Sequence, residues 1–181
     1  MIADKLTHKA ALTLLMIMTA STASALSNNT ITFQGEVTTE TCSVTVNGND
    51  ASPVILMPTV STKDLNESGK TAGLTSFTIG VSGCTGDPKT TTKISTVFVG
   101  NNISPSGNLL NTGTAKNVEI QIVAPDNKIV NLANAYAGSG DLTLNPGDTS
   151  ASADYTAQYY ATGTPTAGTV NAALQYSVTY Q

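Results

Sequence analysis

The side chains that could carry out acid–base chemistry in this chain are a small set of carboxylates. Glu36 and Glu40 are close enough in sequence to suggest a glycosidase-type pair. They lie on and just after one predicted strand, however, and no apolar pocket is implied around them. Asp141, Asp148 and Asp154 lie in or beside predicted loops, where a solvated surface position is expected. None of these groups predicts catalysis.

The residue types that most active sites need are scarce. The only histidine is His8, all eight basic residues are lysines, and tryptophan is absent. Beyond residue 25 the chain therefore has no imidazole for a catalytic triad or a zinc site, and no guanidinium for planar recognition of phosphate. The composition predicts a protein that is not an enzyme, with no cofactor and no bound metal.

Tyrosines and cysteines offer two further kinds of site. Tyr155, Tyr159 and Tyr160 lie close together, and aromatic groups of this kind can bind sugars, but their strand-like spacing favours packing in a sheet. Cys42 and Cys84 have no basic neighbour to activate a thiol. In an exported chain an even cysteine count predicts a disulfide bond, which here stabilises the fold by about 4 kcal/mol in the chain-entropy model.

Export is predicted by residues 1–25, which have the three parts of a secretory signal peptide. These are a positive start, an apolar stretch too short to cross a bilayer and a small-residue cleavage site, found at Lys5 to Lys9, Ala10 to Ala20 and Ala23 to Ala25. The expected mature chain begins at Leu26 and is exported in water-soluble form, with no membrane insertion.

The charge balance limits the partners of the mature chain. Without Asp4, Lys5 and Lys9 it has six lysines against eleven acidic residues, a net charge of −5. Charged residues are 11% of the whole chain, against about 25% in an average globular domain. A weakly charged, acidic surface predicts no binding to nucleic acid or anionic lipid.

The hydrophobic pattern has a period of two, which is typical of half-buried strands. Clusters of Gly, Asn, Asp and Pro separate the alternating segments, so the pattern predicts one β-sandwich domain with no long helix. Residues 59–73 hold at most a short turn, capped near Ser61 or Asp64. The predicted strands are 31–37, 42–46, 77–81, 93–99, 118–122, 129–132, 155–159 and 170–180.

The two ends of the mature chain have complementary characters. Residues 170–180 alternate cleanly and carry no Lys or Pro to protect a sheet edge, so an exposed edge or a groove is expected beside them. Residues 26–30 are polar and lead into an alternating segment that can add as a strand to another molecule. A self-contained sandwich, acting as a small secreted adhesin or glycan-binding module, remains the alternative.

Several sequence segments resemble one known family, the major subunits of type 1 fimbriae. The resemblance spans nearly the whole mature chain and includes the contexts of both cysteines, a penultimate tyrosine and a glycine fourteenth from the end. The matching segments are Phe33 to Val37, Thr41 to Val44, Phe77 to Cys84, Gly113 to Ile122, Tyr155 to Gly163 and Gly168 to Ala172.

The resemblance implies an all-β fold, an incomplete immunoglobulin-like β-sandwich that lacks its last strand and is completed by donor-strand complementation. Residues 26–37 would form the donor extension, overlapping the first strand, and residues 38–181 the pilin domain, with a disulfide between Cys42 and Cys84. The donor residues would be Asn29, Ile31, Phe33, Gly35 and Val37. The groove and the chaperone contact would be formed by Gly168, Leu174, Tyr176, Val178 and Tyr180.

The implied function is that of a structural subunit in the shaft of a chaperone–usher fimbria that supports cell adhesion. Its partners would be copies of itself or related pilins, a periplasmic pilus chaperone and an outer-membrane usher. In one respect the sequence departs from the family pattern. Asn28 and Asn29 stand where the donor segment usually has a glycine, which leaves the register of strand insertion open.

Overall fold

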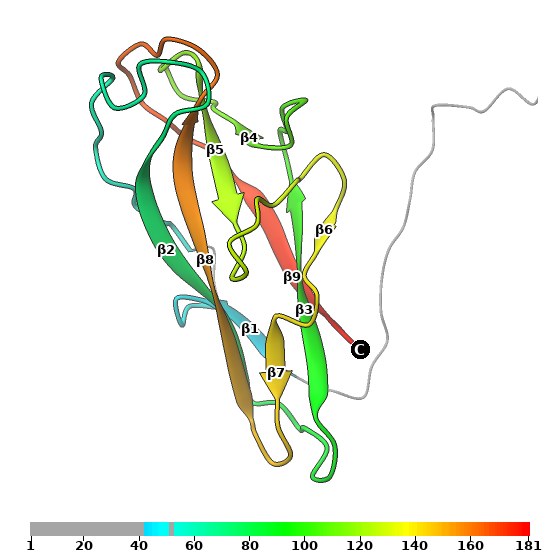
Figure 1. Cartoon of the computed structure of the whole chain (residues 1–181). Helices are drawn as coiled ribbons and strands as arrows, with labels where there is room; N and C mark the ends of the chain where they lie inside the picture. The colour runs from blue at the N-terminus through cyan, green and yellow to red at the C-terminus, as the bar shows by residue number, and fades with distance from the viewer. Residues whose placement is uncertain (1–41, 51–52) are drawn as a thin grey trace, which may run out of the picture. The chain divides into compact units, whose positions relative to one another are not determined.

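The structure is a computed structural model that describes residues 42–50 and 53–181. These residues form β-strands joined by turns and loops, and no helix occurs among them (Figure 1). The strands are β1 (Ser43–Val46), β2 (Thr71–Ser82), β3 (Thr92–Gly100), β4 (Leu109–Leu110), β5 (Val118–Val123), β6 (Tyr136–Ala137), β7 (Leu142–Leu144), β8 (Ser150–Ala161) and β9 (Leu174–Tyr180). The predicted signal peptide and donor extension lie outside the described residues.

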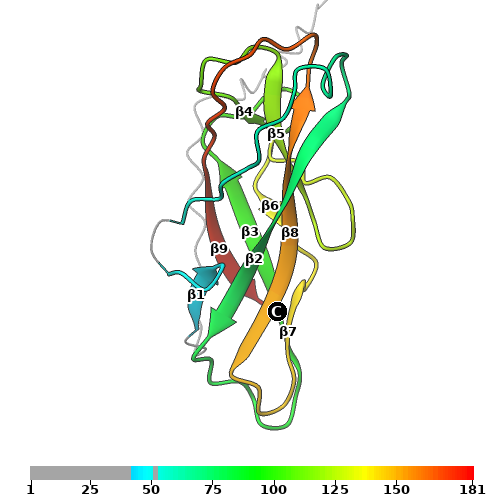
Figure 2. The same ribbon diagram turned by 90° about the vertical axis from the view of Figure 1, so that its left-hand side faces the viewer.

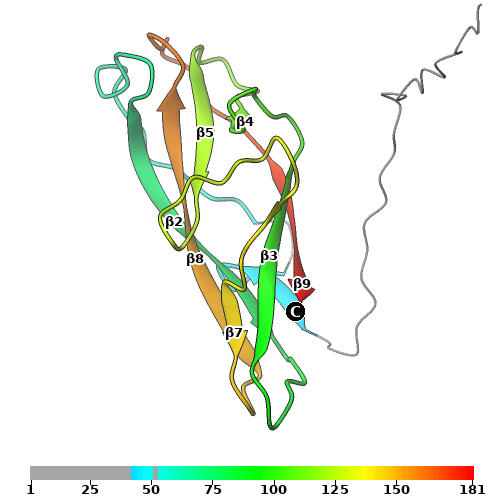
Figure 3. The same ribbon diagram turned by 45° about the vertical axis from the view of Figure 1, so that its right-hand side comes forward.

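Two antiparallel sheets make up the described part of the chain. One has the strand order β1-β2-β8-β5-β4, and the other is built around β3. Strand β3 pairs with β6 and β7 through successive parts of one edge, at Val97–Phe98 and Thr92–Ile94. Its other edge pairs with β9 from Ile94 to Gly100, so β9 lies on the side of β3 away from β7 (Figure 3).

A continuous apolar core packs between the sheets. Of the alternating side chains predicted for β2 and β5, Phe77, Ile79, Val81, Ile120 and Ile122 belong to it, whereas Val118 packs in a second, smaller cluster. Strand β3 contributes Ile94 and Phe98, both fully buried. Because the side chains of a strand alternate between faces, each of these strands covers the core with every second residue.

Strand β5 is an exception to simple alternation, since its outward-facing residues are buried as well. Glu119, only 7% exposed, accepts hydrogen bonds through Oε2 from Ser104 Oγ (3.0 Å), Ser106 Oγ (3.0 Å) and Asn108 Nδ2 (2.9 Å). Gln121 donates to Asn108 Oδ1. These bonds hold residues 104–108 over the outer face of β5, which satisfies a buried carboxylate without an ion pair.

The disulfide bond between Cys42 and Cys84 is present in the structure. Cys42 comes directly before β1, and Cys84 follows two residues after the end of β2. Since β1 pairs with β2 in antiparallel register, the bond closes the open end of this pair. It therefore fixes an edge strand of only four residues to its neighbour.

The structure confirms the all-β sandwich and differs from several predicted strand boundaries, among them the start of β8 at Ser150, five residues earlier than predicted. Strand β2 begins at Thr71, in a small and polar stretch without alternation, and its pairing with β8 contains an irregularity between Ala72 and Thr75. Gly73, with φ of 69°, takes the left-handed conformation there, which favours glycine. Residues 129–132 form a single bridge at Ile129 and no strand. The last strand begins at Leu174, four residues later than predicted.

The loop before β2 contains the predicted capped turn. Asp64 Oδ2 accepts a hydrogen bond from the amide of Ser61, and the Ser61 hydroxyl oxygen accepts one from the amide of Lys63. Across residues 42–50 and 53–181 there is no helix with the length and apolar character needed to span a membrane.

Candidate strand-binding groove

An apolar groove of about 810 Å³ opens between the two sheets. Its floor consists of core side chains from both sheets, including Phe77, Phe98 and Ile122. Protein interiors are normally filled to the density of organic crystals. A hollow of this size over buried side chains therefore marks a place where the described part of the sandwich lacks packing partners.

One wall of the groove is the extended segment 53–57, which follows the hairpin after β1. Ile55 and Met57 pack against the core, whereas Val54 (79% exposed) and Leu56 (84% exposed) face outward. Figure 2 shows this segment, in cyan, rising from near β1 to the loop that precedes β2. Within the described part of the chain its backbone makes no hydrogen bond with another backbone group, so it behaves as an unpaired strand.

The opposite wall is β9 together with the residues that lead into it. Strand β9 pairs with β3 through one edge, and its other edge has no strand partner among the described residues. Leu174 and Tyr176 line the groove, while Gln175 and Ser177 between and after them are exposed. Within the part of the chain that the structure describes, no strand lies between these two walls over the apolar floor, so the groove can take one more extended strand, whose main chain would pair with a wall.

Phe77 and Phe98 in the floor of the groove belong to an aromatic cluster that also contains Tyr155. The ring of Phe98 lies 4.9 Å from that of Tyr155 and 6.3 Å from that of Phe77, measured between ring centroids. The Tyr155 hydroxyl donates to Asp141 Oδ2 at 2.9 Å, and burial raises the pKa of this phenol above its ordinary value. Tyr155 is thus a core residue that stays neutral and anchors the neighbouring loop.

The predicted groove residues fall into two groups. Leu174 and Tyr176 line the hollow. Val178 and Tyr180 lie further along the same strand, half-buried and packed against the core. They pack against the core like the first pair, as the alternation predicts, but they are not among the residues that line the groove.

Gly168 is not among the residues that line the groove. It lies where residues 166–169 pack tightly along residues 114–116, joined by the hydrogen bond from the Ala115 amide to the Thr169 carbonyl (3.0 Å). A methyl group on Gly168 would come within 2.8 Å of the carbonyl carbon of Thr114. The glycine is therefore needed for close backbone packing at the entry to β9.

Replacing Gly168 by alanine should destabilise the fold by about 1–3 kcal/mol, because backbone atoms cannot move aside for the added methyl group. Gly163→Ala is the matched control, since its methyl group would lie 3.7 Å from Asn117, an ordinary contact. Guanidinium unfolding of both variants measures the difference. Equal guanidinium midpoints for the two variants would show that residues 166–169 and 114–116 are not tightly packed at Gly168.

Residues 53–57 are the part of the groove that sequence reasoning missed. They read Pro-Val-Ile-Leu-Met and are followed by Pro58. A fully apolar run between two prolines does not alternate, and proline cannot donate to a strand ladder. An apolar segment whose flanking prolines cannot donate backbone hydrogen bonds was the sequence signal that could have identified this wall of the groove.

The three aspartates considered for acid–base chemistry all accept hydrogen bonds within the fold. Asp141 accepts hydrogen bonds from the amide and the hydroxyl of Thr96 as well as from Tyr155, so it is held inside the loop and is not simply solvated as predicted. Asp148 accepts from the amide of Asn145 within its own turn. Asp154 lies in β8 and accepts from the Thr78 hydroxyl across the strand pair. Glu36 and Glu40 lie outside the described residues.

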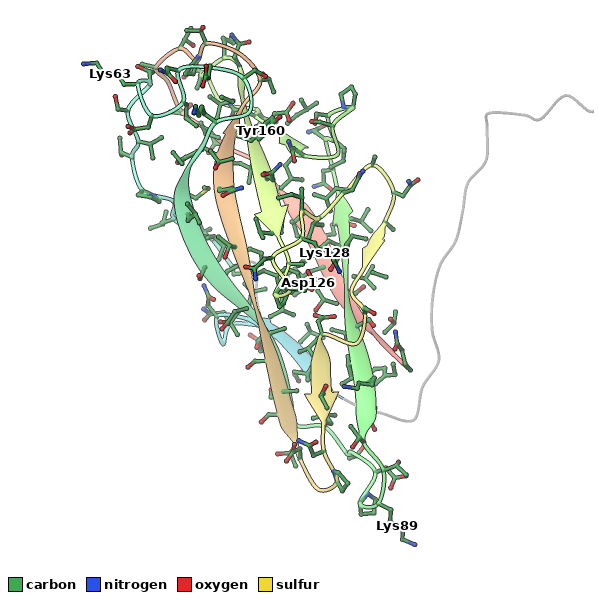
Figure 4. All side chains as sticks on the ribbon, in the orientation of Figure 1. Lys63, Lys89, Asp126, Lys128 and Tyr160 are labelled. Atoms are coloured by element: carbon green, nitrogen blue, oxygen red, sulfur yellow. A yellow bond between two sulfur atoms is a disulfide. The ribbon has the colours of Figure 1, made fainter. Side chains whose placement is uncertain are left out.

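Charged side chains are spread over the described surface (Figure 4). Lys63 and Lys89 lie at opposite ends of the sandwich, and Lys128 forms an exposed ion pair with Asp126 at 2.6 Å. This pairing lowers the pKa of Asp126 and raises that of Lys128. Among the described residues no three side chains of His, Cys, Asp or Glu are grouped to hold a metal ion.

The fold has clear counterparts among solved structures. The P pilus rod subunit PapA matches with a TM-score of 0.56 and 21% identity, over 77% of this chain and 99% of that one. A type I fimbria protein of Burkholderia pseudomallei matches with a TM-score of 0.53 and 22% identity, over 78% and 95% of the two chains. The groove-bearing sandwich is thus the immunoglobulin-like fold found in pilus subunits.

Sequence comparisons identify the family itself. The family model described as "Fimbrial protein" matches residues 31–181. The F17 fimbrial protein of Escherichia coli is 37% identical over 168 residues, covering 90% of this chain and 92% of that protein. The major fimbrial subunit SMF-1 of Stenotrophomonas maltophilia (strain K279a) is 33% identical, covering 91% and 99%. The chain belongs to the fimbrial protein family, as the sequence motifs predicted.

Proposed function

We propose that this protein is a structural subunit of the shaft of a chaperone–usher fimbria, which polymerises by strand exchange and supports cell adhesion. The observation that carries this proposal is the apolar groove, which lies between segment 53–57 and β9, where neither wall has a strand partner across the groove among the described residues. Membership of the fimbrial family, with fimbrial subunits at 30–37% identity, supports the same function.

Residues 26–37 are the proposed donor segment of the next subunit. Ile31, Phe33 and Val37 alternate with polar residues, so one face of the segment can fill the groove. Burying Ile31 and Phe33 contributes about 1.5–3 kcal/mol each, and each main-chain hydrogen bond to a groove wall adds about 0.5–1.5 kcal/mol. A contact between a groove and the tail of another copy is head-to-tail and does not close, so it yields a fibre.

The remaining parts of the proposal concern export. Residues 1–25 direct the chain to the periplasm, where a pilus chaperone covers the groove, and an outer-membrane usher then exchanges the chaperone strand for the donor segment. The assembled subunit is extracellular. Within this scheme Leu174 and Tyr176, which line the groove, and Val178 and Tyr180 beside them form the chaperone contact.

Deletion of residues 26–37 should abolish assembly. Both the full chain and the deletion variant are exported together with the chaperone, and the products are sized after the chaperone is removed. The full chain should give a ladder of denaturant-resistant multimers, whereas the variant should stay monomeric because it has no strand to donate. A synthetic 26–37 peptide should then raise the melting temperature of the variant, and a scrambled peptide of the same composition is the control.

Donor-strand assembly would be contradicted if the full chain and the deletion variant were both monomeric, had the same cooperative melting curve and did not respond to the peptide. The sandwich would then be self-contained. The alternative function, a small secreted adhesin or glycan-binding module, would take its place.

A further inference from the structure

A second, polar hollow lies beside the apolar groove. It has a volume of about 320 Å³, near the lower end of the range of about 300–1,000 Å³ for small-molecule pockets. It shares residues 171–173 with the apolar groove but extends to the loops after β3 and β4. The side chains that decide its chemistry are those of Asn101, Asn102, Leu110, Thr112, Asn171 and Ala172.

The three chain segments that form this hollow are tied to one another through their backbones. The amide of Leu110 donates to the carbonyl of Asn102 at 2.9 Å, and the amide of Thr112 donates to the carbonyl of Asn171 at 2.8 Å. The amide of Asn171 in turn donates to Asn111 Oδ1 at 2.9 Å. A ligand would meet a largely preformed site, which reduces the entropy cost of binding.

The side-chain amides of this hollow are not used by the fold. Within residues 42–50 and 53–181, those of Asn101, Asn102 and Asn171 make no hydrogen bond to another residue. Each amide has two N–H donors and one carbonyl acceptor. Three unused amides around one hollow therefore supply donors and acceptors side by side, together with an apolar surface from Leu110, which is 40% exposed.

We propose that this polar hollow binds a neutral saccharide unit of a glycan. Sugar hydroxyls both donate and accept, so they match asparagine amides, and the C–H faces of the ring match Leu110 and Ala172. Among the described residues no charged side chain lines the hollow, so a phosphate or carboxylate ligand would lack the charge-assisted bonds that anions need. Repeated along the proposed fibre, even a weak site gains avidity.

The test uses the full-length exported protein, as fibres or as monomers, on an array of neutral, sialylated and sulfated oligosaccharides. The array carries host-type glycans and bacterial polysaccharides in separate arms to distinguish the two sources. Neutral glycans should bind, and the double variant Asn101→Ala/Asn102→Ala, whose residues line the polar hollow but not the apolar groove, should weaken that binding at least tenfold. Asn134→Ala, which removes an exposed amide outside the hollow, is the matched control and should bind like the unmodified protein.

An unmodified protein that binds no neutral glycan, or only anionic ones, would overturn the proposal, as would a folded double variant that binds normally. Melting curves establish that the variants are folded. Should the double variant not fold, the single variant Asn101→Ala serves instead, because that side chain bonds to no other described residue and is exposed. Fibre formation is measured in parallel, so loss of glycan binding with intact assembly separates this site from the donor-strand groove.

Discussion

Replacing Phe98 by alanine is expected to lower the free energy of unfolding by about 3–5 kcal/mol. Phe98 is fully buried and contacts the rings of Phe77, Tyr136 and Tyr155. Truncation removes both its transfer energy and its contacts with these rings, which are fixed by other strands and cannot collapse into the space. The same change enlarges the floor of the apolar groove, so a peptide of residues 26–37 should bind more weakly to a chain that lacks those residues.

The neighbouring residue provides the control for this experiment. Val99 belongs to the same strand but is 45% exposed and points to the other face. Val99→Ala should change the stability by no more than about 0.5 kcal/mol, as is usual for surface positions. Guanidinium unfolding of the monomeric protein compares the two variants. A Phe98 variant no less stable than the Val99 variant would show that the aromatic cluster does not hold the sheets together.

Removing the disulfide bond by Cys42→Ser/Cys84→Ser should cost about 4 kcal/mol, the chain-entropy value for a loop of this length. The bond joins residues separated by 42 positions, and its loss frees β1 to leave the sheet edge. Because β1 contributes Val46 to the wall of the apolar groove, the variant should also accumulate poorly after export.

A reductant supplies the control for the disulfide prediction. Dithiothreitol should move the unfolding midpoint of the unmodified protein toward that of the double serine variant and leave the variant unchanged. If the variant and the oxidised protein unfold at the same guanidinium concentration, the bond contributes nothing to stability. If the reductant also shifts the variant, the effect comes from something other than this bond.

The strands with clean alternation were predictable because alternation is a local property. Side chains of a strand point to opposite faces at every second residue, so Phe77, Ile79 and Val81 in β2 and the apolar residues of β5 mark their own buried face. The disulfide bond followed equally simply from two cysteines in an exported chain. Family membership followed from short motifs around those same strands and cysteines.

The short strands β4, β6 and β7 were not predictable, since each has only two or three residues and no period can be recognised in so few. They exist because loops after β3 and β5 return to pair with long strands. The buried side of β5 that carries Glu119 was also missed. From the sequence alone a carboxylate is expected to be exposed. The burial of Glu119 depends on hydrogen-bond donors from residues 104–108, which come near it only in the folded chain.

By itself, the sequence of this protein determined the all-β class, the inward faces of the long strands, the cysteine pair and the fimbrial family. An open edge beside the last strand was expected as well, but the folded chain was needed to show that β3 is the strand that pairs with β9 and that residues 53–57 line the opposite wall of the apolar groove. The physical reason is that strand pairing uses backbone groups, which are the same in every residue except proline. Side chains can therefore suggest an open edge, as those of residues 170–180 do, but which strands become neighbours depends on how the whole chain folds.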